Sequence, residues 1–344
     1  MVEEADYLFE RENFERELSK NLGKLKTIRV LIIGDTIIDR YTYVTPKGRA
    51  IKDPILSCAF NYEENYVGGA LAIANHACSY VGEVKLITLI GDKDPQLEFI
   101  QGSLKEGISL KTFTKKDSPT TVKERFIDLP RGQKMFKVEH MNDEPISEEL
   151  SEEIANFLEK ELPNYDVVIV SDYGHGFLDK RIRGVLQEKS RFLSLNVQSN
   201  SANMGYNYVR GYGRSDFLTM NEEELRLPLG MRFEGIEEII PKFQEVFGHG
   251  KFLVTLSKKG CMLFDRGRIY YGHSIANKVL DTVGAGDAVF TIASLFVYSG
   301  MDDSMIPFIS NCAGSIGANI VGNKEFVDKN RLIEFMGGAH NGLD

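Results

Sequence analysis

The sequence predicts an α/β fold in which a doubly wound, mostly parallel sheet is flanked by helices and carries a small protruding β-sheet lid. Short apolar runs alternate along the chain with segments of helical periodicity, which is typical of a parallel sheet buried on both faces. The first three runs end in Gly and Asp or Ser and Asp, where turns follow the carboxyl ends of such strands. Two further stretches alternate apolar and polar residues, which indicates half-exposed antiparallel strands.

The elements of the main sheet follow from these patterns. Core strands are expected at Ile28–Ile33, Val84–Ile90, Asp166–Val170, Phe192–Leu195, Phe217–Met220 and Phe252–Leu256. Helices are expected at Gly69–Val81, Pro95–Lys105, Ser147–Glu161, Leu178–Lys189, Ile236–Phe247, Ala285–Tyr298 and Ser304–Ile320.

Residues 1–26 are predicted to form an N-terminal helical extension, and residues 27–344 the main domain. The extension is charged, and its apolar residues recur at helical spacing: Leu8, Phe9, Phe14, Leu18, Leu22 and Leu25. The alternating stretches at about 41–61 and 120–138 are interpreted as the β lid, which closes over a ligand or forms a dimer contact.

Composition excludes several classes of protein. The 41 basic and 50 acidic residues give a net charge of −9, which does not suit a protein that binds nucleic acid. The four cysteines and six histidines show no metal-ligand spacing. No Walker A or G-x-G-x-x-G pattern occurs, which disfavours P-loop NTPases and dinucleotide dehydrogenases. We therefore expect a cytoplasmic protein with a small-molecule substrate and no membrane or nucleic-acid partner.

The segment Asp281-Thr282-Val283-Gly284-Ala285-Gly286-Asp287 runs directly into an apolar helix. Backbone N–H groups at a glycine-rich helix N-terminus point at one spot, and the helix dipole also favours an anion there. Asp287 would lie in the first turn, where its carboxylate could accept the proton of an attacking hydroxyl during phosphoryl transfer. The alternative is that Asp287 only complements the helix dipole and the glycines form a plain turn.

Other candidates follow the predicted strands, because ligands bind beyond the carboxyl ends of the strands in such a sheet. They are Asp35, Asp39, Asp92, Asp172, His175, Asn221, Glu224 and Ser257. Basic residues on the lid could clamp a substrate phosphate or merely protect strand edges from aggregation: Lys47, Arg49, Lys52 and Arg125.

The D-T-V-G-A-G-D segment, the early Gly34-Asp35 with Asp39, and Gly68-Gly69 occur in an order that resembles the ribokinase-like (PfkB) carbohydrate and nucleoside kinases. Within that family, the segments 34–43, 119–125 and 171–176 look most like the heptose-phosphate kinase half of the bifunctional ADP-heptose synthesis enzymes. The resemblance implies a ribokinase-like fold and transfer of phosphate to the hydroxyl of a sugar or sugar phosphate.

The resemblance also implies a role for each matching residue. Asp287 would be the base, with Gly284, Ala285 and Gly286 as the anion hole, while Asp39, Asp35, Gly68, Gly69 and Arg125 would bind the substrate. The nucleotide would be held by Asn221, Thr255, Ser257, Gly260, Asp281, Thr282 and Asn311, and Glu224 would serve Mg²⁺. The alternative for Glu224 is a place on a solvated helix face, because it belongs to an acidic run. ATP and Mg²⁺ are the implied cofactors, a monovalent cation such as K⁺ beside residues 281–287 is a further option, and a homodimer through the β lids is expected.

Three departures from the family pattern fall on the substrate and phosphate-donor side. Ile73 replaces the expected substrate-binding asparagine, Asn196-Val197-Gln198 replaces Asp-Pro-Lys, and His175 replaces a lysine. His175 could face the γ-phosphate, but a hydrogen-bonded loop histidine is the more common case. The departures leave two alternatives open: a nucleotide- or sugar-binding pseudokinase that acts as a regulatory module, and a nucleoside kinase of the same superfamily.

Overall fold

The computed structural model describes residues 2–4, 11–201, 203–275 and 279–341. The strands in these ranges are β1 (Val2–Glu4), β2 (Arg29–Arg49), β3 (Leu56–Gly69), β4 (Glu83–Gly91), β5 (Ile108–Lys115), β6 (Val122–Asp128), β7 (Gln133–His140), β8 (Val167–Asp172), β9 (Leu193–Val197), β10 (Phe217–Asn221), β11 (Lys251–Thr255), β12 (Gly260–Asp265) and β13 (Arg268–His273). The helices are α1 (Arg11–Leu25), α2 (Ala70–Ala77), α3 (Leu97–Ser103), α4 (Glu148–Glu161), α5 (Lys180–Lys189), α6 (Glu222–Arg226), α7 (Ile236–Phe247), α8 (Ala285–Ser299), α9 (Ile306–Gly317) and α10 (Lys329–Asn341).

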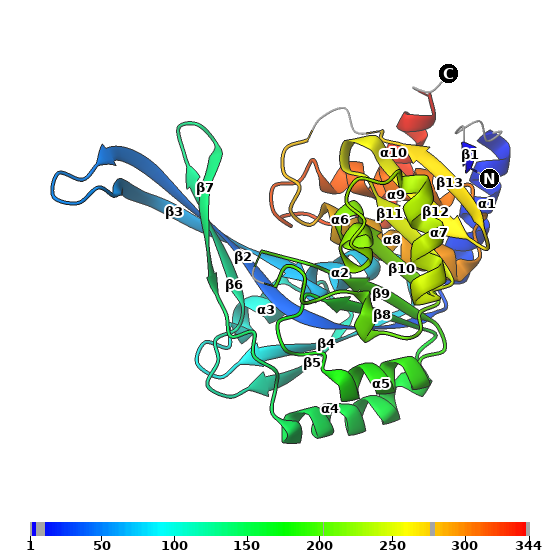
Figure 1. Cartoon of the computed structure of the whole chain (residues 1–344), viewed down its shortest axis with the longest axis horizontal. Helices are drawn as coiled ribbons and strands as arrows, with labels where there is room; N and C mark the ends of the chain where they lie inside the picture. The colour runs from blue at the N-terminus through cyan, green and yellow to red at the C-terminus, as the bar shows by residue number, and fades with distance from the viewer. Residues whose placement is uncertain (1, 5–10, 202, 276–278, 342–344) are drawn as a thin grey trace.

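The main sheet has the strand order β1-β13-β12-β11-β10-β9-β8-β2-β4-β5. Neighbours from β11 through β5 are parallel, and β12 is antiparallel to both β11 and β13. Since β2 lies in the middle and the chain winds outward on both sides of it, the sheet is doubly wound. This confirms the predicted fold class (Figure 1).

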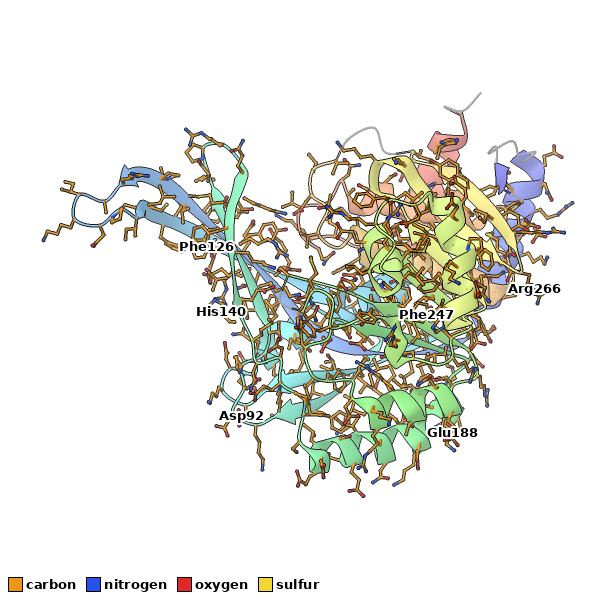
Figure 2. All side chains as sticks on the ribbon, viewed as in Figure 1. Asp92, Phe126, His140, Glu188, Phe247 and Arg266 are labelled. Atoms are coloured by element: carbon orange, nitrogen blue, oxygen red, sulfur yellow. The ribbon has the colours of Figure 1, made fainter. Side chains whose placement is uncertain are left out.

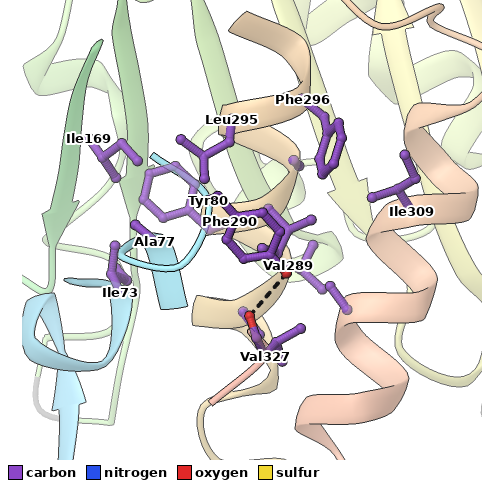
Figure 3. Close-up of a cluster of buried hydrophobic side chains, with 14 of the residues drawn as sticks. Ile73, Ala77, Tyr80, Ile169, Val289, Phe290, Leu295, Phe296, Ile309 and Val327 are labelled. Carbon is purple, nitrogen blue, oxygen red and sulfur yellow. Dashed lines mark hydrogen bonds between the residues drawn. The ribbon is translucent and has the colours of Figure 1, made fainter. Parts of the chain in front are cut away.

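Helices cover the sheet on both faces, and each face has its own hydrophobic core. Along β2, Val30 and Ile32 point into the core under α1, α2, α8, α9 and α10, whereas Leu31 and Ile33 point into the core under α4, α5 and α7. Alternate residues of a strand point to opposite faces, so an uninterrupted apolar run places apolar side chains in the cores on both faces of the sheet. Figure 3 shows part of the first core, where Ile73 of α2 packs near α8 and the Tyr80 hydroxyl donates to the Val327 carbonyl over 3.1 Å.

The lid is formed by β3, β6, β7 and the second half of β2. β3 is antiparallel to β2, β6 is parallel to β2, and β7 is antiparallel to β6. The first predicted core strand and the first lid strand are therefore one continuous strand of 21 residues. The β2–β3 hairpin projects far from the body (Figure 1), and Figure 2 shows its side chains, with Phe126 of β6 labelled on the lid.

The N-terminal segment agrees with the predicted helix over α1 and differs from it at residues 2–4. Helix α1 packs Phe14, Leu18, Leu22 and Leu25 into the same core as α8 and α9, so it is part of the body. Val2–Glu4 forms a strand beside β13, although the segment was predicted to be helical. Three residues are too few for a periodic pattern to reveal a strand. Leu8 and Phe9 lie outside the described residues.

Several elements of the structure were not predicted from the sequence. The unpredicted elements are β5, β12, β13, α6 and α10, which are edge strands, a hairpin or a short or terminal helix. Within the ranges that the structure describes, no helix has both the length and the apolar content for a membrane span.

Candidate active site

A cleft of about 340 Å³ lies between the carboxyl ends of the central strands and the root of the lid. Most of the residues to which the family resemblance assigns a role come together along its wall. These are Asp39, Gly69, Arg125, Asn221, Glu224, Thr255, Thr282, Gly284, Gly286 and Asp287. The lid residues Lys47, Arg49 and Lys52 are not among the residues that line it.

Asp287 lies in the first turn of α8 and is buried at the bottom of the cleft. The hydroxyl of Tyr173 donates to Asp287 Oδ1 over 2.7 Å, and Gln198 Nε2 is 3.5 Å from the same oxygen. Burial raises the pKa of Asp287 to about 7, the charge of Asp39 also raises it, and the Tyr173 hydrogen bond opposes the rise. A carboxyl group with this pKa can accept a proton near neutral pH.

The chain enters α8 through a turn that only glycine fits. Gly284 has φ +82°, and a Cβ there would lie 1.9 Å from Asn323 Oδ1. Gly286 is already helical, and a Cβ there would meet nothing within 4 Å. The left-handed turn at Gly284 therefore lets the backbone begin a 15-residue helix, and Gly284, Gly286 and Asp287 at its start line the cleft. Such a terminus attracts an anion.

Asp39 and Arg125 face each other on neighbouring strands β2 and β6. Arg125 Nη1 donates to Asp39 Oδ1, and both side chains are largely buried. Gly68 allows this packing, since a Cβ there would be 2.6 Å from Asp39 Oδ2. Gly69 has φ +56°, and a Cβ on it would be 2.7 Å from the carbonyl oxygen of Asp35. The two glycines thus bring the end of β3 against the middle of β2, where Asp35 and Asp39 lie.

A wall of basic side chains from the lid faces Asp39 and Asp287. Lys123 and Arg125 are two residues apart on β6, so they share one face of the strand, and Lys137 of β7 joins them. Burial lowers the pKa of Lys123, whose ammonium lies 5.1 Å from the centre of the Tyr173 ring. This face would balance the negative charge of a ligand in the cleft.

On the opposite wall, Asn221 and Glu224 form a capping box at the start of α6. Asn221 Oδ1 accepts the Glu224 N–H over 2.8 Å, and Glu224 Oε2 accepts the Asn221 N–H over 2.9 Å. Glu224 Oε1 accepts the N–H of Ser199 over 3.0 Å. Burial raises the pKa of Glu224 to about 7. Glu224 is therefore buried at the cleft and does not lie on a solvated helix face, which was the alternative interpretation of this acidic run.

Several predicted site residues lie away from the cleft wall. Asp35 is buried beneath it, where its carboxylate accepts the Tyr173 N–H over 2.8 Å. The side-chain amide of Asn311 donates to the carbonyl oxygens of Gly272 and His273 at the end of β13, over 2.9 Å each. The others are Gly68, Ser257, Gly260, Asp281 and Ala285.

The departures from the family pattern fall into two groups. Ile73 is buried in the core, and the Asn75 amide holds the end of α3 through Ser103 O and Lys105 N. Asn196 and Gln198, in contrast, line the cleft, and Gln198 Nε2 donates to Tyr173 Oη over 3.2 Å. The segment that replaces Asp-Pro-Lys thus contacts the hydroxyl that holds Asp287.

His175 is buried, and neither of its ring nitrogens has a hydrogen-bond partner in the structure, so the expectation of a hydrogen-bonded loop histidine is wrong. It stacks on Tyr173 with ring centres 6.2 Å apart. Burial, with the charge of Lys123, lowers the pKa of His175 to about 3. It is therefore a neutral packing residue at physiological pH.

The long polar stretch before Arg214 supports the segment that carries Tyr173. Asn200 and Asn203 donate to the carbonyl oxygen of Tyr173 over 2.9 and 2.7 Å, and Asn207 donates to that of Asp172 over 3.1 Å. These amides satisfy the Tyr173 oxygen and give a second donor to the Asp172 oxygen, which also accepts the Gln198 N–H over 2.8 Å.

The sequence patterns predict no role for Tyr173, Lys123 or Lys137. A signal for Lys123 was present, because it alternates with Arg125 on a predicted lid strand. No local pattern could assign Tyr173 to Asp287, since the two lie 114 residues apart in the chain.

The chain is thus a doubly wound α/β protein with a lid, and the cleft between them is lined by basic side chains and a helix N-terminus that suit a small anionic ligand. Residues 27–297 match the model of the pfkB family carbohydrate kinase. The chain belongs to this family, as predicted, and is therefore a phosphotransferase that acts on alcohol acceptors.

A relative from Desulfatibacillum aliphaticivorans, "Bifunctional protein HldE", is 26% identical over 310 residues, which cover 88% of this chain and 62% of that protein. The chain thus spans less than two thirds of this bifunctional relative, in agreement with the predicted likeness to one half of a bifunctional enzyme.

Solved structures show the same fold. Arabidopsis thaliana ribokinase complexed with ribose and ATP has a TM-score of 0.68 at 18% identity, covering 90% of this chain and 99% of its own. Escherichia coli phosphofructokinase-2 in complex with potassium has a TM-score of 0.71 at 12% identity, covering 91% and 99%. Kinases of this family use ATP and Mg²⁺.

Proposed function

We propose that this chain transfers the γ-phosphoryl group of ATP to a hydroxyl group of a sugar or sugar phosphate. Asp287 acts as the base, and the N–H groups at the start of α8 receive the negative charge of the transferred group. Phosphoryl transfer depends mainly on positioning and charge neutralisation, so a weak base suffices. The observation that carries the proposal is that Asp39, Asp287 and the glycine turn at Gly284 line one cleft.

The acceptor lies between the lid and the sheet. Asp39 accepts hydrogen bonds from its hydroxyl groups, and Arg125, already paired with Asp39, fixes the orientation of that carboxylate. Gly69 lets the substrate approach the backbone where β3 ends. Asp287 then lies below a hydroxyl held at the bottom of the cleft, with Tyr173 holding its Oδ1 and leaving Oδ2 to accept the proton.

The nucleotide occupies the part of the cleft bordered by Asn221, Thr255 and Thr282. The residues present fit Mg²⁺, because a buried carboxylate faces the cleft and Mg²⁺ prefers oxygen ligands and retains several waters. Glu224 would hold it, with Asn221 beside it, and Mg²⁺ would supply charge neutralisation at the phosphates when bound. Two N–H groups orient the Glu224 carboxylate for this role.

The test is a panel of sugars, sugar phosphates and nucleosides incubated with ATP and Mg²⁺, with ADP formation as the readout. We expect one class of sugars or sugar phosphates to be phosphorylated, and D287N to lose about 10²–10⁴-fold in kcat while its Kd for MgADP stays within about threefold of wild type. Thermal stabilisation by these ligands without turnover would favour a pseudokinase, and turnover of nucleosides alone a nucleoside kinase.

We further propose that the chain forms a homodimer through its lids. The lid carries large apolar side chains that are exposed in the single chain, which is unusual for a free surface: Ile51, Ile55, Leu56, Phe60, Tyr62, Phe136 and Val138. Sedimentation at several protein concentrations tests this proposal. We expect a dimer for the wild type and a monomer for F60E, whereas a wild-type monomer at every concentration would refute it.

A further inference from the structure

The carboxylate of Asp281, at the start of the glycine-rich loop, has no free acceptor site. Oδ1 accepts from Lys134 Nζ over 2.6 Å and from Val283 N over 3.1 Å. Oδ2 accepts from Tyr41 Oη over 2.5 Å and from Gly322 N over 3.2 Å. A carboxylate offers about four lone-pair sites, so these four donors saturate it.

The neighbouring carbonyl oxygen of Ala318 is occupied as well. It accepts the N–H groups of Leu280 and Asp281 over 2.8 and 3.1 Å. Among the described residues, no group of three His, Cys, Asp or Glu side chains could form another metal site. The oxygens at the start of the loop therefore do not fit a free monovalent cation, although the family resemblance allows one there.

The positive charge at this position comes from the protein itself. Lys134 lies on β7 of the lid, and its ammonium also lies 5.3 Å from the centre of the Tyr41 ring. The Asp281 side chain is only 4% exposed. Burial alone would raise the pKa of Asp281, but the hydrogen bonds from Lys134 and Tyr41 hold it below its usual value. The buried carboxylate is therefore ionised and neutralised by a tethered ammonium.

We propose that the ammonium of Lys134 replaces a free monovalent cation beside the Asp281–Asp287 loop, so that the chain binds its nucleotide without K⁺ or Na⁺. An ammonium group and K⁺ carry the same charge and are similar in size, so either neutralises this carboxylate. The inference rests on the proposed function for its effect on nucleotide binding. Because Lys134 belongs to the lid, it also ties the geometry of the anion-binding loop to the position of the lid.

The test compares wild type, K134A and K134R in KCl, NaCl and choline chloride at about 0.1 M ionic strength. The Kd of MgADP is measured by calorimetry, and the midpoint of thermal unfolding is measured without nucleotide. K324M is the matched control, because Lys324 also joins lid and body, through Glu64 at 3.7 Å, without contacting Asp281.

For the wild type, K134R and K324M, we expect the same Kd and the same midpoint in all three salts. K134A leaves room for a cation, so it should bind MgADP about tenfold more weakly in choline chloride, which is about 1.4 kcal/mol. KCl should restore most of that affinity and raise the midpoint of K134A alone.

Two results would overturn the inference: a wild-type midpoint or Kd that depends on K⁺, or a K134A variant whose defects KCl leaves unchanged. The absence of MgADP binding by every variant in every salt would count against the proposed function instead. In that case the midpoints still decide whether Lys134 replaces the cation.

Discussion

Replacing Asp287 by asparagine should stabilise the folded protein at pH 8 more than at pH 5. The folded state raises the pKa of this carboxyl from 3.8 to about 7. Between these two values the folded state keeps a proton that the unfolded state releases, so the contribution of Asp287 to stability falls as pH rises. Asparagine does not ionise, so it loses no stability as the pH rises. Its side-chain oxygen can still accept the hydrogen bond of the Tyr173 hydroxyl.

The magnitude follows from the width of this interval. Each pH unit contributes about 1.36 kcal/mol, and about two units of the interval lie between pH 5 and pH 8. We therefore expect D287N to gain about 2–3 kcal/mol more in free energy of unfolding at pH 8 than at pH 5. Urea unfolding followed by circular dichroism at the two pH values measures this difference.

D92N is the control for the sign of the effect. Asp92 is exposed, and hydrogen bonds from the backbone of Asp117 and Ser118 lower its pKa. Because the folded state favours this charge, D92N should show no gain in free energy of unfolding at pH 8. If D287N changes the free energy of unfolding equally at both pH values, the argument that burial, rather than packing, determines the protonation state of Asp287 is refuted.

Three further outcomes are expected. Y173F removes the donor that lowers the pKa of Asp287. The acid limb of the pH profile of kcat/KM should therefore shift to higher pH by about one unit, and an unchanged limb would contradict this. G284A should lose about 1–3 kcal/mol of stability from backbone strain and about tenfold in MgADP affinity, whereas G286A should unfold no more easily than wild type. R125M should raise the acceptor KM about tenfold and leave the Kd of MgADP unchanged; calorimetry and steady-state kinetics separate the two.

Local sequence determined much of the fold and part of the cleft. Apolar runs closed by Gly and Asp predicted the strands of the parallel sheet, because a strand buried on both faces needs apolar residues at every position. The same rule places polar side chains at the strand ends. One candidate chosen by this rule, Asp39, lines the same cleft as Asp287, which the glycine-rich segment singled out.

The local rule failed where a contact depends on the path of the whole chain. Glu224 was weighed as part of an acidic surface run, and only the packing of β9 and β10 shows it buried against Ser199. The position of Asn311 at the nucleotide, which the resemblance implies, stays a prediction, and its amide holds the end of β13. Both strand β13 and its partner β12 were missing from the predicted set.

The sequence by itself therefore determined the family, the sheet and the glycine turn that opens α8, since these depend on residue spacing within short segments. Only the tertiary structure decided what neutralises Asp281 and what holds Asp287. Lys134 lies 147 residues from Asp281, and Tyr173 lies 114 residues from Asp287. Hydrogen bonds of 2.6 and 2.7 Å between such distant residues arise only when the lid and the sheet fold around the start of α8, and no periodicity in the sequence encodes them.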